Sequence, residues 1–581
     1  MAMLLRRGGT RQRATAAAVA LAAAALITGA LAARGGQAAP QATRPNVIVL
    51  MTDDQDSRSL SVMTRVQRLL GDEGVTFDSS FVSFSLCCPS RATFLTGQYA
   101  HNHGVLGNEP PQGGYTKLDN SNTLPVWLRR AGYHTGLVGK YLTGYGYLNP
   151  ATEVPPGWEE WHGTVDPSTT SYFGYTLNEN GSLRSYNFEP ANYQTDVEGQ
   201  KAVDLVRRFA PSADPYFLWI AFLAPHAGTP IEARDPREFG TPTPAPRHQS
   251  VLASQPLPRP ESFNEADMSD KPLVIRGLPP LDEAKIAAIQ ANYQQRLEAL
   301  LAVDEAVARI VEAVRESGEL ENTYIVFTSD NGYLHGEHRV PNGKVLLYEP
   351  SIRVPLLMRG PGIPRGVHRR QLVSNVDLAP TILELTGASP GVTVDGRSLV
   401  PIFRDGGLEW GRDLAFERGP EREPPGAQFS ALRTPRYMYA EYANGDRELY
   451  DLVRDPEELQ SRHGDPTFAS LMAELSGRLA SLRGCAGDAC RRGPALTLVT
   501  ASPGACVRGR LAVRLRGPDA SRLERVDVSV GGRRVASATS PPFAVRLGAQ
   551  ALPRRQALLR VRAQLLDGRA LTLDRTLRRC R

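Results

Sequence analysis

The sequence predicts an α/β fold with a central, mostly parallel sheet flanked by helices. A small antiparallel sheet follows, and then an appended all-β sandwich of immunoglobulin type. Continuous apolar runs, such as residues 46–51 and 216–223, alternate with segments of helical periodicity, as buried parallel strands and their covering helices do. From residue 494 onward, short runs of alternating apolar and polar residues replace this pattern, which is typical of two packed sheets.

The strands of the central sheet are expected at five short apolar runs. These are residues 46–51, 134–138, 216–223, 324–328 and 354–358. Residues 282–317 and 376–386 have helical periodicity and are expected to be helices. Open α/β sheets bind ligands beyond the carboxyl ends of their strands, so functional side chains are expected there.

Two further segments complete the body of the chain. Residues 228–280 are rich in proline and polar residues without a clear period, which indicates a long surface loop over the site. Residues 429–452 contain short strand-like runs around Asn444, Gly445 and Asp446, a turn sequence, and are expected to form the small antiparallel sheet.

The amino terminus has the pattern of a secretory signal peptide. Arginines at positions 6, 7, 11 and 13 precede an apolar run over residues 16–33, and small residues follow before Pro40. The alternative is an uncleaved anchor helix. The expected division of the chain is a signal peptide at 1–42, a catalytic domain at 43–483, a linker at 484–493 and a basic β-sandwich module at 494–581.

The cysteines fit an exported protein, in which disulfides persist. Cys485 and Cys490 could close a small loop, and Cys506 and Cys580 could join the two ends of the C-terminal module. The second bridge closes a long loop and would stabilise the module by about 4 kcal/mol if chain entropy dominates.

The net charge of +6 hides an uneven distribution. Residues 494–581 carry 18 arginines and 5 acidic residues, or +13, whereas residues 43–493 carry 44 basic and 56 acidic residues, or −12. Such asymmetry can indicate an anionic partner for the module, either an anionic polymer or the cell wall. Surface arginines on a spacer domain are the alternative, and no nucleic-acid partner is expected.

Two pairs of oxygen-bearing side chains follow predicted strands. Asp53 and Asp54 come after the first strand, and Asp330 and Asn331 come after the run at 324–328. Adjacent carboxylates repel one another unless a cation lies between them. Because no cysteine–histidine cluster accompanies them, the four favour a hard cation such as Ca²⁺ or Mg²⁺ over a transition metal.

Residues 87–97 (CCPSRATFLTG) match the pattern C-x-P-S-R-x-x-x-L-T-G. A buried cysteine in a turn before a helix would be the plain structural explanation. The match is instead the signature of type I sulfatases, which the chain resembles over about residues 44–460. The resemblance is closest to the N-acetylglucosamine-6-sulfatase branch, which has near counterparts of RPNVIVLMTDDQD and of LTGQYAHNHGV.

The resemblance implies that a formylglycine-generating enzyme oxidises Cys87 to formylglycine. One hydroxyl of the hydrated aldehyde attacks sulfur and the other allows the sulfated intermediate to collapse, so one difficult step becomes two easier ones. It also implies that Ca²⁺ is bound by Asp53, Asp54, Asp330 and Asn331 together with the oxygen of the modified Cys87. The cation would offset charge on the transferring group.

Four further residues match family positions. Arg91 corresponds to the arginine that positions the modified residue, Lys140 and Lys344 to the lysines that hold sulfate oxygens, and His226 to the general acid for the leaving group. Many sulfatases have a second histidine two residues after the first lysine, where this chain has Leu142. His226 is therefore expected to carry more of the proton transfer.

The function expected from these residues is that of a secreted enzyme that hydrolyses sulfate monoesters. By resemblance, the leading substrate is a sulfated carbohydrate such as N-acetylglucosamine 6-sulfate, as in the breakdown of glycosaminoglycans. Two alternatives stay open: a phosphonate monoester hydrolase or phosphodiesterase of the same superfamily, and a glycan-binding protein whose Cys87 remains an unmodified thiol.

Overall fold

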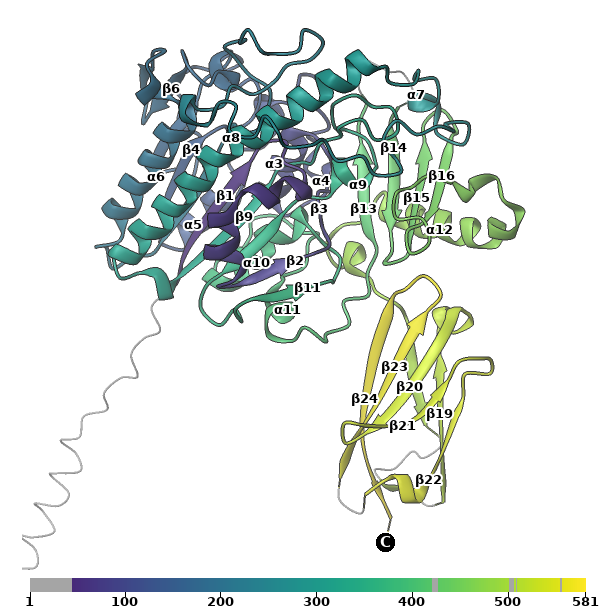
Figure 1. The fold of residues 1–581 in the computed structure, drawn as a ribbon. Coiled ribbons are helices and arrows are strands. Elements are labelled where there is room, and N and C mark those ends of the chain that lie inside the picture. Colours follow the sequence, from purple (N-terminus) through teal and green to yellow (C-terminus); the bar gives the residue numbers. More distant parts are fainter. Residues whose placement is uncertain (1–43, 421–426, 501–505, 508, 554–555, 581) are drawn as a thin grey trace, which may run out of the picture. The chain divides into compact units, whose positions relative to one another are not determined.

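The computed structural model describes residues 44–580 except 421–426, 501–505, 508 and 554–555 (Figure 1). The predicted signal peptide lies outside the described residues. Within the part that is described, no helix is both long and apolar enough to cross a membrane.

A ten-stranded sheet forms the centre of the body. Its strand order is β11-β2-β10-β9-β1-β8-β4-β5-β6-β7. Five neighbouring strands, from β9 to β5, run parallel. They are β9 (Thr323–Ser329), β1 (Asn46–Thr52), β8 (Tyr216–Ala221), β4 (His134–Gly139) and, at the end of the run, β5. Every residue of β1, β8 and β9 is buried, which explains why these strands appear as unbroken apolar runs.

The sheet is mixed, so the expectation of a mostly parallel sheet holds for its centre but not for its flanks. On one flank, β10 (Leu356–Arg359) pairs antiparallel with β9 and with β2 (Val75–Phe77). On the other flank, β6 (Thr176–Glu179) pairs antiparallel with β5 (Glu160–Thr164) and with β7 (Ser182–Ser185). Only the two residues Asn180 and Gly181 separate β6 from β7, at φ values of 52° and 90°. So short a connection requires an antiparallel hairpin.

Helices cover both faces of the sheet (Figure 1). On one face α6 (Gln194–Phe209) and α8 (Glu283–Glu316) bury Val206, Val303 and Ile310 against Ile48 and Leu50 of β1. On the other face the core includes Phe94 of α3 (Cys87–Thr96), Trp127 of α5 (Leu124–Arg130) and Ile382 of α10 (Leu378–Thr386).

The predicted helix at 282–317 is confirmed with its ends. The side chain of Asp282 caps α8 by accepting a hydrogen bond from the backbone N–H of Lys285 at 2.8 Å, and Ser317 is the residue at the C-cap. Residues 228–280 contain only one short 3₁₀ turn and α7 (Leu273–Arg276), in agreement with the predicted long loop. The remaining short elements are α2 (Thr64–Val66), α4 (Ala100–His103), α9 (Glu349–Ile352), α11 (Val400–Arg404), β3 (Ser80–Phe81), β11 (Val367–Arg369) and β12 (Val373–Ser374).

A four-stranded antiparallel sheet closes the body, as predicted from residues 429–452. Its strands are β13 (Leu414–Arg418), β14 (Phe429–Arg433), β15 (Tyr437–Tyr442) and β16 (Arg447–Asp451), with α12 (Ala469–Leu482) packed against it. The predicted disulfide between Cys485 and Cys490 is confirmed, with an S–S distance of 2.06 Å.

The C-terminal residues form two sheets around an apolar core of their own. One sheet has the order β17-β19-β22 (Thr497–Thr500, Arg510–Arg516 and Val545–Gly548). The other has the order β18-β24-β23-β20-β21 (Cys506–Val507, Ala570–Arg579, Ala557–Leu565, Leu523–Val530 and Arg533–Ala538). An immunoglobulin-type topology for these sheets stays a prediction.

The second predicted disulfide can be followed only in part. The backbone N–H of Cys580 donates to the carbonyl of Val507 at 3.1 Å, so the two ends of the module lie side by side. Cys580 is disulfide-bonded, as predicted, but the side chain of Cys506 lies outside the described residues, so the pairing of Cys580 with Cys506 stays a prediction.

Candidate active site

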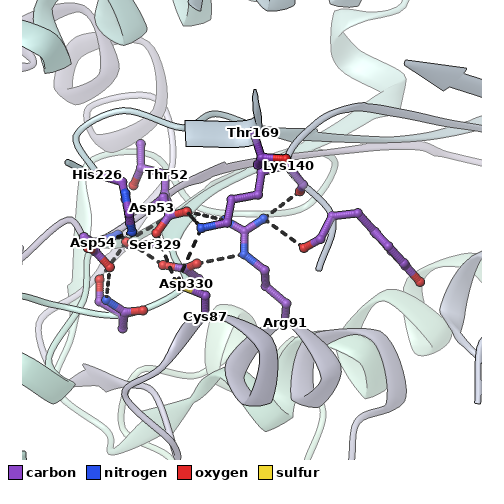
Figure 2. Close-up of polar contacts among 12 residues, drawn as sticks. Thr52, Asp53, Asp54, Cys87, Arg91, Lys140, Thr169, His226, Ser329 and Asp330 are labelled. Atoms are coloured by element: carbon purple, nitrogen blue, oxygen red, sulfur yellow. Dashed lines mark hydrogen bonds and ion pairs between the residues drawn. The ribbon is translucent and has the colours of Figure 1, made fainter. Parts of the chain in front are cut away.

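The carboxyl ends of four of the parallel strands carry most of the polar residues singled out in the sequence. Asp53 and Asp54 follow β1, Asp330 follows β9, and Lys140 follows β4. His226 lies five residues after the end of β8. Because adjacent parallel strands end at the same edge, side chains distant in the sequence come together there, and Figure 2 shows them in mutual contact.

Cys87 is the first residue of α3 and is 1% exposed. Its Sγ lies 3.0 Å from Lys344 Nζ, 3.6 Å from Lys140 Nζ and 3.5 Å from Asp53 Oδ1. Burial, together with the charge of Asp53, raises the pKa of the Cys87 thiol to about 12. An unmodified thiol here would stay protonated at neutral pH and would be a poor nucleophile.

Three carboxylates lie within this buried site. Burial alone would raise the pKa of Asp53, but neighbouring cations, Lys140 foremost, hold it well below its ordinary value. Asp54 behaves in the same way, with Lys344 as its main cationic neighbour. Burial and the charge of Asp53 instead raise the pKa of Asp330. The cluster thus has more negative charge than it readily stabilises.

Asp54 has an unusual backbone conformation, with φ at 68°. Residues other than glycine rarely adopt this left-handed region, and such outliers gather at functional sites. The backbone N–H of Asp54 donates to Asp330 Oδ1 at 3.1 Å, and Arg296 donates to the Asp54 carbonyl. Contacts from two other elements therefore hold the turn after β1 in this conformation.

Arg91 lies one helical turn after Cys87 and is fully buried. Its Nε donates to Asp330 Oδ2 at 2.8 Å, its Nη2 lies 3.3 Å from Asp53 Oδ2, and its Nη1 donates to the carbonyl of Lys140 at 2.6 Å. One guanidinium thus connects the ends of β1, β4 and β9 and fixes their relative positions.

The two lysines pair with the two adjacent carboxylates. Lys140 Nζ contacts Asp53, and Lys344 Nζ contacts Asp54. Burial alone would lower the pKa of each lysine, but these carboxylates raise both pKa values above the ordinary value, so both side chains are cationic. The side chain of Lys140 is 5% exposed and that of Lys344 is 14% exposed.

His226 is the most exposed member of the site, with 22% of its side chain accessible. Its Nδ1 lies 2.6 Å from the carbonyl of Ala227, which accepts a hydrogen bond from it, and its Nε2 lies 3.8 Å from Asp54 Oδ2. Burial lowers the pKa of His226, against the charges of Asp53 and Asp54. Nε2 is therefore the nitrogen at which a proton can be exchanged.

Apart from Cys87 and His226, the donor set consists of oxygens, which suit a hard divalent cation. Ligand atoms of Asp53, Asp54, Cys87 and His226 all lie within 4.8 Å of one another. The amide of Asn331 donates from Nδ2 to Asp54 Oδ1 at 2.6 Å, while its Oδ1 is buried without a hydrogen-bond partner among the described residues. An orphaned oxygen beside three carboxylates matches the oxygen ligands that Ca²⁺ prefers.

Sequence reasoning missed Arg296, which is 2% exposed in the middle of α8. Its Nη1 donates to the Pro225 carbonyl at 2.9 Å, and its guanidinium lies 3.6 Å from the ring centroid of Tyr333. It fixes the turn that carries Asp54 and the turn that carries His226. The signal was present, because position 296 falls on the apolar stripe of the helix, between Tyr293 and Leu300.

The other histidines near the signature motif form internal hydrogen bonds or ion pairs. The pairs are His101 with Glu417 at 2.5 Å, His103 with Thr93 at 3.0 Å, His335 with Asp56 at 3.7 Å and His338 with Glu265 at 2.6 Å. These contacts hold loops and helices together around the site.

Comparison with known proteins agrees with this geometry. The sulfatase family model matches residues 45–388, and a second model, the C-terminal region of N-sulphoglucosamine sulphohydrolase, matches residues 336–484. Human N-acetylglucosamine-6-sulfatase is 33% identical over 494 residues, which cover 77% of this chain and 86% of the human protein. An arylsulfatase of Volvox carteri is 35% identical over 502 residues, covering 78% of this chain and 76% of the alga's protein.

Among solved structures, BT4656 in complex with its substrate D-glucosamine-2-N,6-O-disulfate has the same fold. Its TM-score is 0.61 at 24% identity, over 75% of this chain and 97% of that chain. The membership expected from the signature motif is therefore confirmed: the chain belongs to the sulfatase family and is a sulfuric ester hydrolase.

Proposed function

We propose that this chain is an exported enzyme that hydrolyses sulfate monoesters of sugars, with N-acetylglucosamine 6-sulfate as the leading substrate. The observation that carries the proposal is the position of Cys87 between two cationic lysines and beside three carboxylates. The sugar substrate is supported by the relatives that this chain resembles, and export by the pattern of residues 1–42. The division into a catalytic domain at 43–483, a linker at 484–493 and a module at 494–581 belongs to the same proposal.

Formylglycine formed from Cys87 would supply a hydrated aldehyde, whose two hydroxyls allow attack on sulfur and then release of sulfate. The high pKa of the unmodified thiol supports this assignment, because a protonated buried thiol would contribute little. We propose Ca²⁺ as the cation, held by Asp53, Asp54, Asp330 and Asn331 together with the modified residue 87; it would offset negative charge at the reacting sulfate.

Charge balance gives the lysines their role in this proposal. Asp53, Asp54 and Asp330 carry three negative charges, and Lys140, Lys344 and Arg91 carry three positive charges. A bound divalent cation leaves the group with an excess of two positive charges, which suits a sulfate monoester. The Nζ atoms of Lys140 and Lys344 lie nearest Cys87 and would bind the sulfate oxygens as preorganised cations.

His226 is the residue that would protonate the leaving oxygen. Its Nδ1 hydrogen is held by the Ala227 carbonyl, so His226 would act as an acid in its imidazolium form, which delivers the second proton from Nε2. The exposed fractions of the side chains indicate from which side the substrate would enter the site. Arg91 is fully buried, whereas His226 and Lys344 are partly open, so the sugar would lie on their side of the site.

Two measurements test the proposal. The peptide containing residue 87 should be about 18 daltons lighter than the thiol form, as an aldehyde is. The protein should also hydrolyse 4-nitrophenyl sulfate and N-acetylglucosamine 6-sulfate with a higher kcat/KM than an aryl phosphodiester. An unmodified thiol in an active enzyme, or a preference for the phosphodiester, would refute the assignment.

Variants of residue 87 separate attack from release. Cys87→Ala should abolish turnover and leave the fold intact. Cys87→Ser should take up sulfate without releasing it, because serine lacks the second hydroxyl. Multiple turnovers by either variant at more than a small fraction of the wild-type rate would contradict the proposed nucleophile.

A further inference from the structure

One face of the C-terminal module presents a row of arginines. Strand β19 alternates strictly: Leu511, Val513 and Leu515 are buried in the core of the module, while Arg510, Arg514 and Arg516 are exposed on the other side. Because alternate residues of a strand point to opposite faces, the three arginines lie on the outer face of the sheet β17-β19-β22.

The neighbouring strands add a fourth arginine and no acidic residue. Arg546 of β22, also exposed, lies opposite Ala512. Along the other edge of β19, Val499 and Thr497 of β17 pair with Arg514 and Arg516. We call Arg510, Arg514, Arg516 and Arg546 the arginine face.

The arginine face lacks acidic partners among the described residues, whereas three arginines of the opposite sheet have them. No member of it forms an ion pair with any residue that the structure describes. On the five-stranded sheet, by contrast, the ion pairs are Arg525–Asp527 at 2.7 Å, Arg534–Asp527 at 3.8 Å and Arg560–Asp574 at 2.9 Å. Asp527 and Asp574 thus offset three arginines of the five-stranded sheet, whereas the arginine face keeps four cations available for an external anion.

A groove of about 780 Å³ adjoins this face. Arg514, Arg516 and Arg546 line it together with Phe543, Pro541 and Pro542. Phe543 is half-buried against the module's core, so its ring is held in place while one side remains accessible. The groove thus combines guanidinium groups with a fixed apolar wall.

We propose that the arginine face binds a sulfated polysaccharide. Guanidinium groups bind sulfate and carboxylate oxygens in pairs, and an apolar wall suits the C–H face of a sugar ring. Arg514 and Arg516 are two residues apart on an extended strand, or about 7 Å, and Arg546 lies on the adjacent strand. Such a row fits a chain that repeats its anionic groups.

The choice of sulfated polysaccharide over another polyanion rests on the proposed function, since the catalytic site would then act on the same polymer. A second observation argues against single-stranded nucleic acid, which proteins bind by stacking several bases on aromatic side chains. Phe543 is the only aromatic residue between positions 494 and 581.

The test uses the full-length protein and two matched triple variants. The face variant carries Arg514→Gln, Arg516→Gln and Arg546→Gln. The paired-arginine variant carries Arg525→Gln, Arg534→Gln and Arg560→Gln, and it loses the same total charge from the opposite sheet. Binding to immobilised heparin is measured as a function of salt, with single-stranded DNA as the polyphosphate probe and 4-nitrophenyl sulfate turnover as the activity readout.

The face variant should bind heparin about tenfold more weakly than wild type at 0.1 M salt. The slope of log Kd against log salt should fall by about 1 for each arginine that contacts an anion. The paired-arginine variant should bind like wild type, and all three proteins should turn over 4-nitrophenyl sulfate equally.

Three results would overturn the proposal: heparin binding unchanged in the face variant, equal weakening in both variants, or wild-type affinity for DNA equal to that for heparin. The second would mean that net charge alone matters, and the third that any polyanion suffices. Failure of the proposed catalytic function would appear separately, as absent 4-nitrophenyl sulfate turnover in a wild-type protein that still binds heparin.

Discussion

Asp53, Asp54 and Asp330 place three carboxylates in a site where Arg91 and two lysines offset them. Burial and the charge of Asp53 nevertheless raise the pKa of Asp330, so the ionised form of this carboxylate is not fully compensated. Asn331 adds a buried amide oxygen without a partner among the residues described. A bound divalent cation would stabilise the ionised form of Asp330 and would give the Asn331 oxygen a partner. Its binding should therefore stabilise the folded state.

Calcium is therefore expected to raise the melting temperature of the wild-type protein. At a free concentration about 100 times its Kd, a single bound ion adds about 2.7 kcal/mol to the free energy of unfolding. Asp330→Ala should lose this response because it removes a charged ligand, and Asp330→Asn should weaken it. Calorimetry with calcium and with a chelator measures the effect. An Asp330→Ala protein with the full calcium-dependent rise would show that Asp330 is not a ligand.

His226 offers a second test at the scale of one residue. Its Nε2 is the position from which a proton can reach the leaving group, and a sugar alkoxide needs that proton far more than 4-nitrophenolate does. His226→Ala should reduce kcat for N-acetylglucosamine 6-sulfate about 100-fold or more and affect 4-nitrophenyl sulfate much less. Equal losses on the two substrates would mean that His226 only helps to bind the sulfate ester.

At the scale of elements, the central strands and α8 were predictable because their signals are strong. The runs beginning at Asn46 and Tyr216 are wholly buried strands, and α8 has a capping aspartate at its start. Since parallel strands end at one edge, the meeting of Asp53 with Asp330 followed from the strand assignments.

Other features were not predicted, for physical reasons. The strands β5 to β7 are short and polar, with β7 fully exposed, so their periodicity is weak; the Asn180–Gly181 turn was their one clear signal.

Arg296 was missed because a single arginine in a long helix usually faces solvent. Its position on the apolar stripe of α8 was a signal for burial, but only the packed structure shows that it donates to carbonyls of two turns at the site.

Helix α6 carries a buried acid that the site does not use. Glu198 is fully buried, and neither carboxyl oxygen has a hydrogen-bond partner within the described part of the chain. Burial raises its pKa well above the ordinary value of 4.5, with only a small opposing effect from Arg91. Glu198 therefore keeps its proton to a higher pH in the folded protein than in the unfolded chain, which favours unfolding as the pH rises.

The sign of the pH dependence follows directly. As pH rises above 4.5, the unfolded chain gives up a proton that the folded protein keeps, so stability falls by about 1.4 kcal/mol per pH unit for this one group. Glu198→Gln removes this loss and should be more stable than wild type at pH 7, with little difference at pH 4. Asp204→Asn, on an exposed position of α6, is the matched control and should leave stability unchanged. Parallel stability–pH curves for wild type and Glu198→Gln would contradict the assignment.

At the scale of the whole molecule, charge and chemistry are divided along the sequence. All nine candidate site residues lie between Asp53 and Lys344, in a body of net charge −12. The module of charge +13 has its own apolar core and contributes no residue to the site. Catalysis on a small substrate should therefore not depend on the module.

A protein that ends at residue 493 should keep its kcat/KM for 4-nitrophenyl sulfate, because every site residue and the Cys485–Cys490 disulfide remain. Its retention on heparin should be lost, since the body alone is acidic. Circular dichroism confirms that the shortened body is folded before the rates are compared. A folded but inactive shortened protein would show that the module supports the catalytic domain.

The burial of Cys87 also constrains the order of events during biosynthesis. In the folded protein this residue is 1% exposed, at the base of a site assembled from strand ends as far apart in the chain as Thr52 and Ser329. A modifying enzyme cannot reach a side chain so enclosed, and it cannot wait for the site to form. The oxidation that we propose for Cys87 must therefore occur on the nascent or unfolded chain, before folding and, for an exported protein, before passage through the membrane. A molecule that folds with its thiol intact would then remain inactive, so the active fraction of any preparation is decided before the protein reaches its destination.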